Sequence, residues 1–155
     1  GKVGESITLQ VEALEPLATD LTWEVREPHG GGFLRSRGFT ITYVAPPMAG
    51  TYTLIAEARR TDGSRFRAMV PVTVLPDPSL EPPTVTLPPG GTRTFTARMK
   101  GLPQSTVTWS VEEPDGGDIT PEGFYRAPQR RGTYHVVGTS TLDPTVSATA
   151  TVHVE

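Results

Sequence analysis

The sequence contains no cysteine, which excludes a disulfide framework, a thiolate metal site and a cysteine nucleophile. It has no asparagine either, so it offers no acceptor for N-glycosylation. No apolar run approaches the roughly 18 residues of a membrane-spanning helix, and no stretch keeps a 3.6-residue apolar period. The net charge of −3 leaves no basic footprint for nucleic acid. These absences exclude membrane insertion and nucleic-acid binding and argue against a helical fold.

What the chain does contain points to strands and turns, and to an internal repeat. It has 16 Gly and 16 Pro among 155 residues, with abundant Thr and Val. The segment 21–25 (Leu-Thr-Trp-Glu-Val) returns as 107–111 (Val-Thr-Trp-Ser-Val), an offset of 86 (109 − 23). Each copy is followed by Glu-Pro, a glycine pair, Ala-Pro and Gly-Thr-Tyr. A repeat of this kind predicts two units of similar fold.

The predicted organisation is a first domain at residues 1–75, a linker at 76–83 and a second domain at 84–155. The linker carries prolines at a density that favours an extended, semi-rigid spacer. Each domain contains seven or so short alternating strands separated by Gly/Pro turns, which favours an all-β antiparallel β-sandwich. A barrel is the alternative, and it is less favoured because one Trp per unit occupies the position of a central core residue.

Alternation along the strands predicts which side chains face the core. In the strand predicted at residues 38–45, Phe39, Ile41, Tyr43 and Ala45 share one face. In its last strand, residues 64–75, the inward set is Phe66, Ala68, Val70, Val72 and Val74. Arg65 and Arg67 of that strand point outward, where charge discourages pairing between sheet edges, and Pro71 predicts a bulge or an edge-facing position.

The alignment of the two units predicts that the first domain lacks most of its opening strand. Residues 84–87 open the second unit, and their counterparts 86 positions earlier would precede Gly1, with only Gly1 matching Leu87. A sheet edge left open in this way is filled by upstream residues of the same chain or by a strand of a neighbouring subunit. We favour the upstream chain.

Three groups of residues resemble the bacterial immunoglobulin-like (Big-type) repeats of surface and secreted proteins: 107–111 around Trp109, 123–128 ending in Ala-Pro, and Gly132-Thr133-Tyr134. The first unit repeats them at Trp23, Ala45-Pro46 and residues 50–52. The resemblance covers nearly the whole chain and implies two tandem immunoglobulin-like sandwiches.

The same resemblance assigns roles to individual residues. It implies that Trp23 and Trp109 are third-strand core residues and that Tyr52 and Tyr134 are tyrosine corners, whose hydroxyls bind a backbone group upstream. Leu54 and Val136 stand where antibody domains carry a cysteine. Members of the family serve as stalks, adhesin segments, spacers beside catalytic domains and ornaments of phage particles, and the fold does not choose among these roles.

No residue set predicts catalysis, a cofactor or a metal. Ser, His and Asp occur without a nucleophile-elbow pattern. His29, His135 and His153 have no spacing that would place them on one metal. The loop 112–118 gathers four carboxylates, but it lacks the Asp-x-Asp spacing of a dedicated calcium loop, and we interpret it as a solvated turn.

The predicted function is therefore a non-catalytic structural spacer or an adhesion or assembly segment of an extracellular, surface-attached or virion-associated protein. Its partners would be proteins or neighbouring domains and subunits of the same assembly. Leu34, with Arg35 and Arg37, is the candidate contact patch, because Leu34 has no apolar counterpart in the second unit. One alternative is a carbohydrate- or wall-binding accessory domain of a secreted hydrolase, which requires a row of exposed aromatics. The other is a self-assembling filament or capsid subunit.

Overall fold

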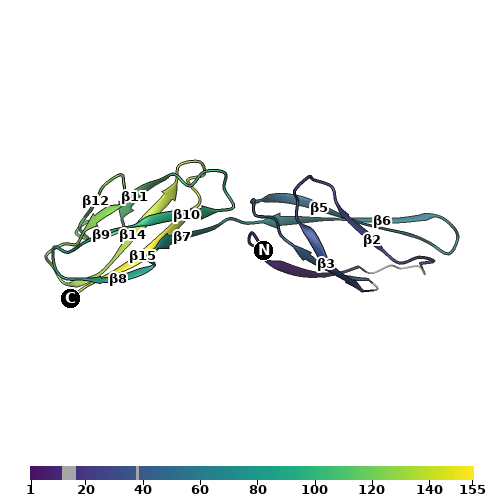
Figure 1. The fold of residues 1–155 in the computed structure, drawn as a ribbon, viewed down its shortest axis with the longest axis horizontal. Coiled ribbons are helices and arrows are strands. Elements are labelled where there is room, and N and C mark those ends of the chain that lie inside the picture. The colour runs from purple at the N-terminus through teal and green to yellow at the C-terminus, as the bar shows by residue number, and fades with distance from the viewer. Residues whose placement is uncertain (12–16, 38) are drawn as a thin grey trace. The chain divides into compact units, whose positions relative to one another are not determined.

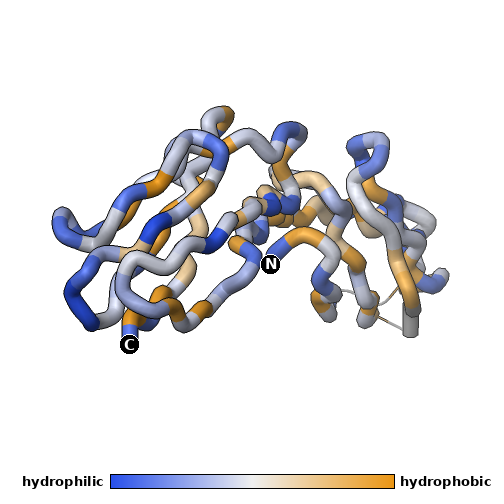
Figure 2. Tube along the Cα trace, turned by 60° about the vertical axis from the view of Figure 1, so that its left-hand side comes forward, coloured by the Kyte–Doolittle hydropathy of each residue, from blue (hydrophilic) through white to orange (hydrophobic). Residues whose placement is uncertain are grey.

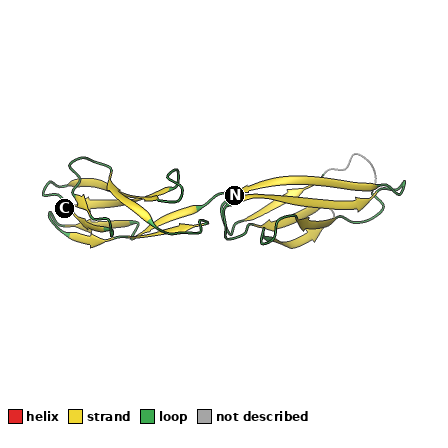
Figure 3. Ribbon diagram, turned by 90° about the horizontal axis from the view of Figure 1, so that it is seen from above, coloured by secondary structure: helices red, strands yellow, loops and turns green. Residues whose placement is uncertain are grey.

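The computed structural model describes residues 1–11, 17–37 and 39–155, without the side chains of residues 35–37. The chain forms two compact units, Gly1–Pro76 and Asp77–Glu155. Each unit consists of strands joined by loops, as Figure 1 shows. Figure 3, coloured by secondary structure, shows no helix in the part of the chain that it describes. The all-β fold predicted from the sequence is confirmed.

The first unit is a sandwich of two three-stranded antiparallel sheets. One sheet has the order β1-β4-β3 and the other β2-β5-β6. Their inward side chains form two clusters: one includes Tyr43, Leu54 and Val74, the other includes Val11, Leu21 and Ala56, and Trp23 packs against both. The strands are β1 (Ser6–Gln10), β2 (Thr22–Val25), β3 (Gly32–Arg37), β4 (Thr40–Val44), β5 (Gly50–Arg59) and β6 (Arg65–Val74).

The second unit repeats this plan and adds strands at its start. One layer contains the sheets β10-β7 and β12-β13-β9, and the other contains β11-β14-β15-β8. β9 and β10 are one run interrupted at Phe95, whose N–H donates to the Gly123 carbonyl at 2.8 Å. All pairs are antiparallel except β15 and β8, which run parallel. The strands are β7 (Asp77–Glu81), β8 (Thr84–Leu87), β9 (Thr92–Thr94), β10 (Thr96–Lys100), β11 (Val107–Val111), β12 (Asp118–Ile119), β13 (Phe124–Arg126), β14 (Gly132–Ser140) and β15 (Ser147–Val154).

The same backbone bond occurs at equivalent ends of both units and supports the alignment of Gly1 with Leu87. The Leu75 N–H donates to the Gly1 carbonyl at 2.8 Å, and the Glu155 N–H donates to the Leu87 carbonyl at 3.1 Å. In the second unit this bond closes the four-residue pair of β8 with β15. In the described part of the first unit, only an isolated parallel bridge between Lys2 and Leu75 corresponds to that pair.

Residues 77–81, which the sequence pattern predicted to be linker, form strand β7 of the second unit. β7 pairs with β10 from Asp77↔Lys100 to Glu81↔Thr96. Its Leu80 is only 4% exposed and belongs to the core of that unit. Pro78 is tolerated because β7 has a single strand neighbour, and edge strands are where proline fits a sheet. The high proline content hid an alternation that places Leu80 inward.

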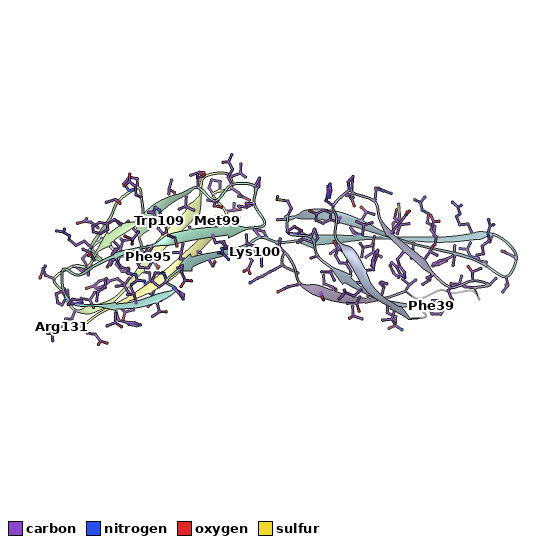
Figure 4. All side chains as sticks on the ribbon, viewed as in Figure 1. Phe39, Phe95, Met99, Lys100, Trp109 and Arg131 are labelled. Atoms are coloured by element: carbon purple, nitrogen blue, oxygen red, sulfur yellow. The ribbon has the colours of Figure 1, made fainter. Side chains whose placement is uncertain are left out.

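The predicted inward faces are mostly confirmed. Ile41, Tyr43 and Ala45 are buried, and β6 alternates as expected. Hydrophobic and hydrophilic residues alternate along the strands in Figure 2. The prediction for Phe39 is wrong: its side chain is 44% exposed, because β4 begins at Thr40 and Phe39 lies in the preceding turn (Figure 4). Figure 4 also labels Phe95, Met99 and Trp109 of the second unit.

The free edge of β6 carries the charged and proline residues that the sequence placed there. Arg65 and Arg67 are exposed, and Arg67 Nε lies 3.3 Å from Glu57 Oε1. The Leu75 N–H points away from β5, toward Gly1, so the nitrogen of Pro71, four residues earlier, faces the same edge. Pro71 therefore lacks a backbone N–H at a position where no hydrogen bond to β5 would form.

The glycine pair of each repeat is required by close backbone approach. Gly31 and Gly117 have φ values of 96° and 98°, a region that side-chain-bearing residues rarely adopt. A Cβ at Gly31 would overlap the Val44 carbonyl oxygen, and one at Gly117 would overlap the Arg126 carbonyl oxygen. The turn after the Trp strand thus packs directly on the backbone of the opposite sheet.

Gly31→Ala is therefore expected to destabilise the first unit by at least about 2 kcal/mol, from the cost of positive φ and the overlap with Val44. The neighbouring Gly32→Ala is the matched control. Nothing lies within 4 Å of a Cβ there, so its effect should stay within about 0.5 kcal/mol. Urea denaturation followed by circular dichroism measures both, and equal stabilities of the two variants would refute the close-approach argument.

Candidate functional site

The Glu-Pro motif after the Trp strand places a carboxylate against the start of a strand in the same sheet. In the first unit Glu27 Oε2 accepts the Thr53 N–H of β5 at 2.7 Å, and in the second Glu113 Oε2 accepts the His135 N–H of β14 at 2.8 Å. The bond from Thr53 is the main reason that the pKa of Glu27 lies below its ordinary value. The motif thus has a structural use in both units.

Two tyrosines of each unit donate their hydroxyls to backbone carbonyls. The Tyr52 hydroxyl donates to the Met48 carbonyl at 2.7 Å and that of Tyr134 to the Arg130 carbonyl at 2.8 Å, which confirms the tyrosine corners. A second pair was missed in the sequence. The Tyr43 and Tyr125 hydroxyls donate at 2.6 Å to the carbonyls of the first repeat glycines, residues 30 and 116. The shared offset of 82 between these tyrosines was the signal available.

Burial dominates the chemistry of this second tyrosine pair. Both side chains are fully buried, and burial raises the pKa of Tyr125 to about 12, with Tyr134 and Glu113 adding to the effect. The pKa of Tyr43 is raised for the same first reason. A phenol with such a pKa remains protonated and serves as a hydrogen-bond donor, not as an acid or base.

The second unit adds a histidine to the Glu-Pro turn. His135 Nδ1 lies 2.5 Å from Glu113 Oε1 and 3.9 Å from Glu112 Oε2. The Glu112 N–H donates to the His135 carbonyl at 2.9 Å, so backbone pairing holds the two residues side by side. Side-chain exposure is 35% for His135 and 27% for Glu113. The ligand-type atoms of all three residues lie within 4.8 Å of one another, which makes them able to hold a metal ion.

The proximity of Glu113 and His135 shifts both pKa values. The hydrogen bond from Glu113 raises the pKa of His135 above its ordinary 6.5, against a smaller opposing effect of burial. For Glu113, burial acts upward, but the hydrogen bonds from the His135 side chain and backbone together outweigh it and lower the pKa below 4.5. Glu113 and His135 are therefore both charged at pH values between 4.5 and 6.5.

The first unit lacks this cluster at the equivalent positions. Arg26 stands in place of Glu112 and Thr53 in place of His135, while Glu27 corresponds to Glu113. Arg26 instead donates from Nη2 to Met69 Sδ at 3.1 Å. The carboxylate that supports the strand is thus common to both units, and the histidine and the second glutamate are specific to the second unit.

The residues singled out in the sequence have mixed outcomes. Leu34 is 71% exposed and sits at a bulge of β3 opposite β4, while the side chains of Arg35 and Arg37 lie outside the described part of the chain. The contact patch stays a prediction. His29 is exposed, and His153 Nδ1 lies 3.3 Å from Thr133 Oγ1. Neither contributes to the cluster around His135, which joins residues 22 positions apart that sequence spacing did not connect.

The surface depressions formed by the described residues bring together few chemically reactive side chains. One of about 310 Å³ is lined by Asp118, Ile119, Thr120, Phe124 and Arg126 of β12, β13 and the intervening loop. Another, of about 420 Å³, is lined by side chains of β7 and β10. Among the described aromatic residues only Phe39 and Phe124 are exposed, at 44% and 42%, and they belong to different units. They do not form the row that a carbohydrate platform needs.

No protein-family model and no curated protein matches the sequence. The fold, in contrast, has solved counterparts. The insect immune protein hemolin is 16% identical over 99% of this chain and 43% of its own, with a TM-score of 0.51. A C-terminal intimin fragment, bound to the intimin-binding domain of its translocated receptor, is 14% identical over 96% of this chain and 57% of its own, with a TM-score of 0.45. Cadherin domains 3–6 of protocadherin gamma B2 follow at 14% identity, 98% and 50% coverage and a TM-score of 0.35.

Of these three structures, hemolin alone bears on the fold class, and it shows nothing finer. The likeness to hemolin supports two tandem immunoglobulin-like β-sandwiches. The chain spans 43% to 57% of the length of the three structures named above. No helix in the described ranges is long and apolar enough to cross a membrane.

Tyr125→Phe is expected to cost about 1–3 kcal/mol, because it leaves the Gly116 carbonyl buried without a donor. Tyr134→Phe should cost only about 1 kcal/mol, since its partly buried bond to Arg130 can be replaced by water. Thermal or urea denaturation of the two variants ranks them. A larger loss for Tyr134→Phe would contradict the assignment of the buried tyrosine as the more important donor.

The ion pair of the second unit should contribute most to stability between about pH 4.5 and 6.5. The His135 contribution is complete below its unfolded pKa and is lost as pH rises through the raised folded pKa. The Glu113 contribution is complete above its unfolded pKa and is lost as pH falls through the lowered folded pKa. An NMR titration should find the His135 pKa above 6.5, falling in Glu113→Gln, which keeps an oxygen for the His135 N–H. An unchanged pKa in that variant would show that Glu113 does not set it.

Proposed function

We propose that the chain is a non-catalytic tandem immunoglobulin-like module of the bacterial surface-repeat type, acting as a structural spacer or as an adhesion or assembly segment. The observation that carries this proposal is the use of its polar groups. Glu27, Glu113 and the hydroxyls of all four tyrosines bind the backbone of their own unit. Groups held in this way maintain the sandwich and are not aimed at a substrate.

The setting that we propose is extracellular or attached to a cell surface, with a protein as partner. The domain arrangement of hemolin has implications for homophilic adhesion, and the intimin fragment was solved in complex with a receptor domain. These are properties of those two proteins. The sequence resemblance to bacterial surface repeats, together with the fold, supports the same setting for this chain. The comparisons lend no support to a virion, so that part of the sequence-based prediction is not pursued.

The carbohydrate- or wall-binding alternative depends on accessible aromatics, and the indoles argue against it. Trp23 and Trp109 are partly buried and pack against the cores of their units. The Nε1 atom of Trp23 is buried without a hydrogen-bond partner. Phe33 packs between Trp23 and Tyr43, with ring centroids 6.0 and 5.9 Å away. These rings are committed to packing, and their faces are not free to stack on a sugar.

Acrylamide quenching of tryptophan fluorescence separates the two functions. For the structural module, quenching of the folded protein should be clearly weaker than in urea, because both indoles pack on the core. Strong quenching in the folded state, reduced by cell-wall glycan fragments, would favour the carbohydrate-binding alternative instead.

Self-association is a separate question for the same protein. Sedimentation velocity at rising concentration should show a monomer if the chain is a spacer that binds other proteins. A concentration-dependent shift to larger species would favour the filament or capsid alternative. Leu34→Ser provides the matched variant, because Leu34 is 71% exposed and its loss should leave thermal stability unchanged. Loss of association in this variant would assign the interface to β3.

A further inference from the structure

We propose that Glu112, Glu113 and His135 form a surface binding site for a divalent transition-metal ion of the zinc class. The proposal goes beyond the structural role of the module, and it departs from the sequence-based expectation that no metal site is present. It rests on the arrangement of three ligand-type side chains, on the backbone bonds that hold them, and on a comparison of the two units.

The backbone positions two of the three side chains before any metal binds. The Glu112 N–H donates to the His135 carbonyl, which continues the pairing of β11 with β14 beyond Val111↔Val136. Glu113 is fixed through Oε2, which accepts the His135 N–H. Its other oxygen, Oε1, faces Nδ1 of the imidazole. A ligand set held by backbone bonds loses little side-chain freedom on binding, which favours affinity.

The distances suit a small ion with nitrogen and oxygen ligands. Zinc binds both donor types at about 2.0–2.2 Å, so tetrahedral ligand atoms lie about 3.3 Å apart. Nδ1 is 2.5 Å from Glu113 Oε1 and 3.9 Å from Glu112 Oε2, values on either side of that separation. Movements of under about 1 Å at side-chain ends would therefore seat the metal where a proton now joins Glu113 and His135.

The donor types select the class of metal. An imidazole nitrogen with two carboxylates suits zinc, copper or nickel, whereas calcium takes six to eight oxygen ligands. Asp115 and Asp118 belong to the same turn but are not part of the cluster. Three protein ligands leave a position for water on the exposed side, where Glu112 is 64% exposed.

The first unit shows that the strand support does not need the additional ligands. Glu27 accepts the Thr53 N–H at 2.7 Å with no histidine or second glutamate present at the equivalent positions. A purely structural account of the Glu-Pro turn is therefore complete without Glu112 and His135. Their joint occurrence in the second unit adds two metal ligands to a carboxylate that was already fixed.

The test is a calorimetric titration of the whole chain, free of any histidine tag, with zinc chloride at about pH 8, where protons compete little for the imidazole. One zinc ion per chain should bind, and excess calcium should not displace it. Zinc should also raise the melting temperature of the second unit, because it binds only the folded arrangement.

Three variants decide whether the bound ion sits at this cluster. His135→Thr places the first unit's residue in the second unit and retains the backbone N–H for Glu113, so it should fold and bind zinc at least about tenfold more weakly. Glu112→Gln should weaken binding in the same direction. His153→Thr, which removes a partly exposed histidine of the same strand pair, should bind like the unmodified chain. Absence of zinc binding, or binding that His153→Thr abolishes and His135→Thr does not, would overturn the proposal.

Discussion

The turn that follows the Trp strand is the constraint on which each sandwich depends, because it hydrogen-bonds to both sheets. Its glutamate, Glu27 or Glu113, accepts an N–H from the strand that pairs with the Trp strand. Its first glycine accepts the hydroxyl of a fully buried tyrosine, Tyr43 or Tyr125, from the opposite sheet. The second glycine then passes so close to that opposite sheet that only glycine fits. Buried polar groups must be paired, and this turn pairs them across the core.

This constraint explains which part of the repeat stays the same and which part differs. Glu, the first Gly and Tyr recur because each completes a buried or partly buried bond in both units, and the second Gly recurs because only glycine fits its close approach to the opposite sheet. The outward positions beside them carry no such requirement. Arg26 contacts Met69 in the first unit, whereas Glu112 joins Glu113 and His135 in the second. The differences between the units at these positions therefore occur around a fixed turn, on the outer face of the sheet.

The fold was largely predictable from the sequence, because the repeat and the two-residue alternation both survive in it. Two errors have physical causes: Phe39 lies in the turn before β4, and the alternation of β7 was hidden by its prolines. The cluster at His135 was harder to predict. It depends on the register Val111↔Val136, which sets Glu112 opposite His135 across β11 and β14. Spacing along the chain does not show this, although a pairing register deduced from the repeat would have done so.

A metal at this position would reinforce the module, because the two oxygens of Glu113 have separate tasks. Oε2 holds the His135 N–H at the start of β14, and Oε1 faces the imidazole. A cation on Oε1 and Nδ1 leaves the backbone bond intact, and it replaces a proton-dependent contact with one that also includes Glu112. Binding to the folded state alone shifts the unfolding equilibrium toward that state. The site would thus connect metal availability to the stability of the second sandwich, a property that suits the structural role proposed for the module.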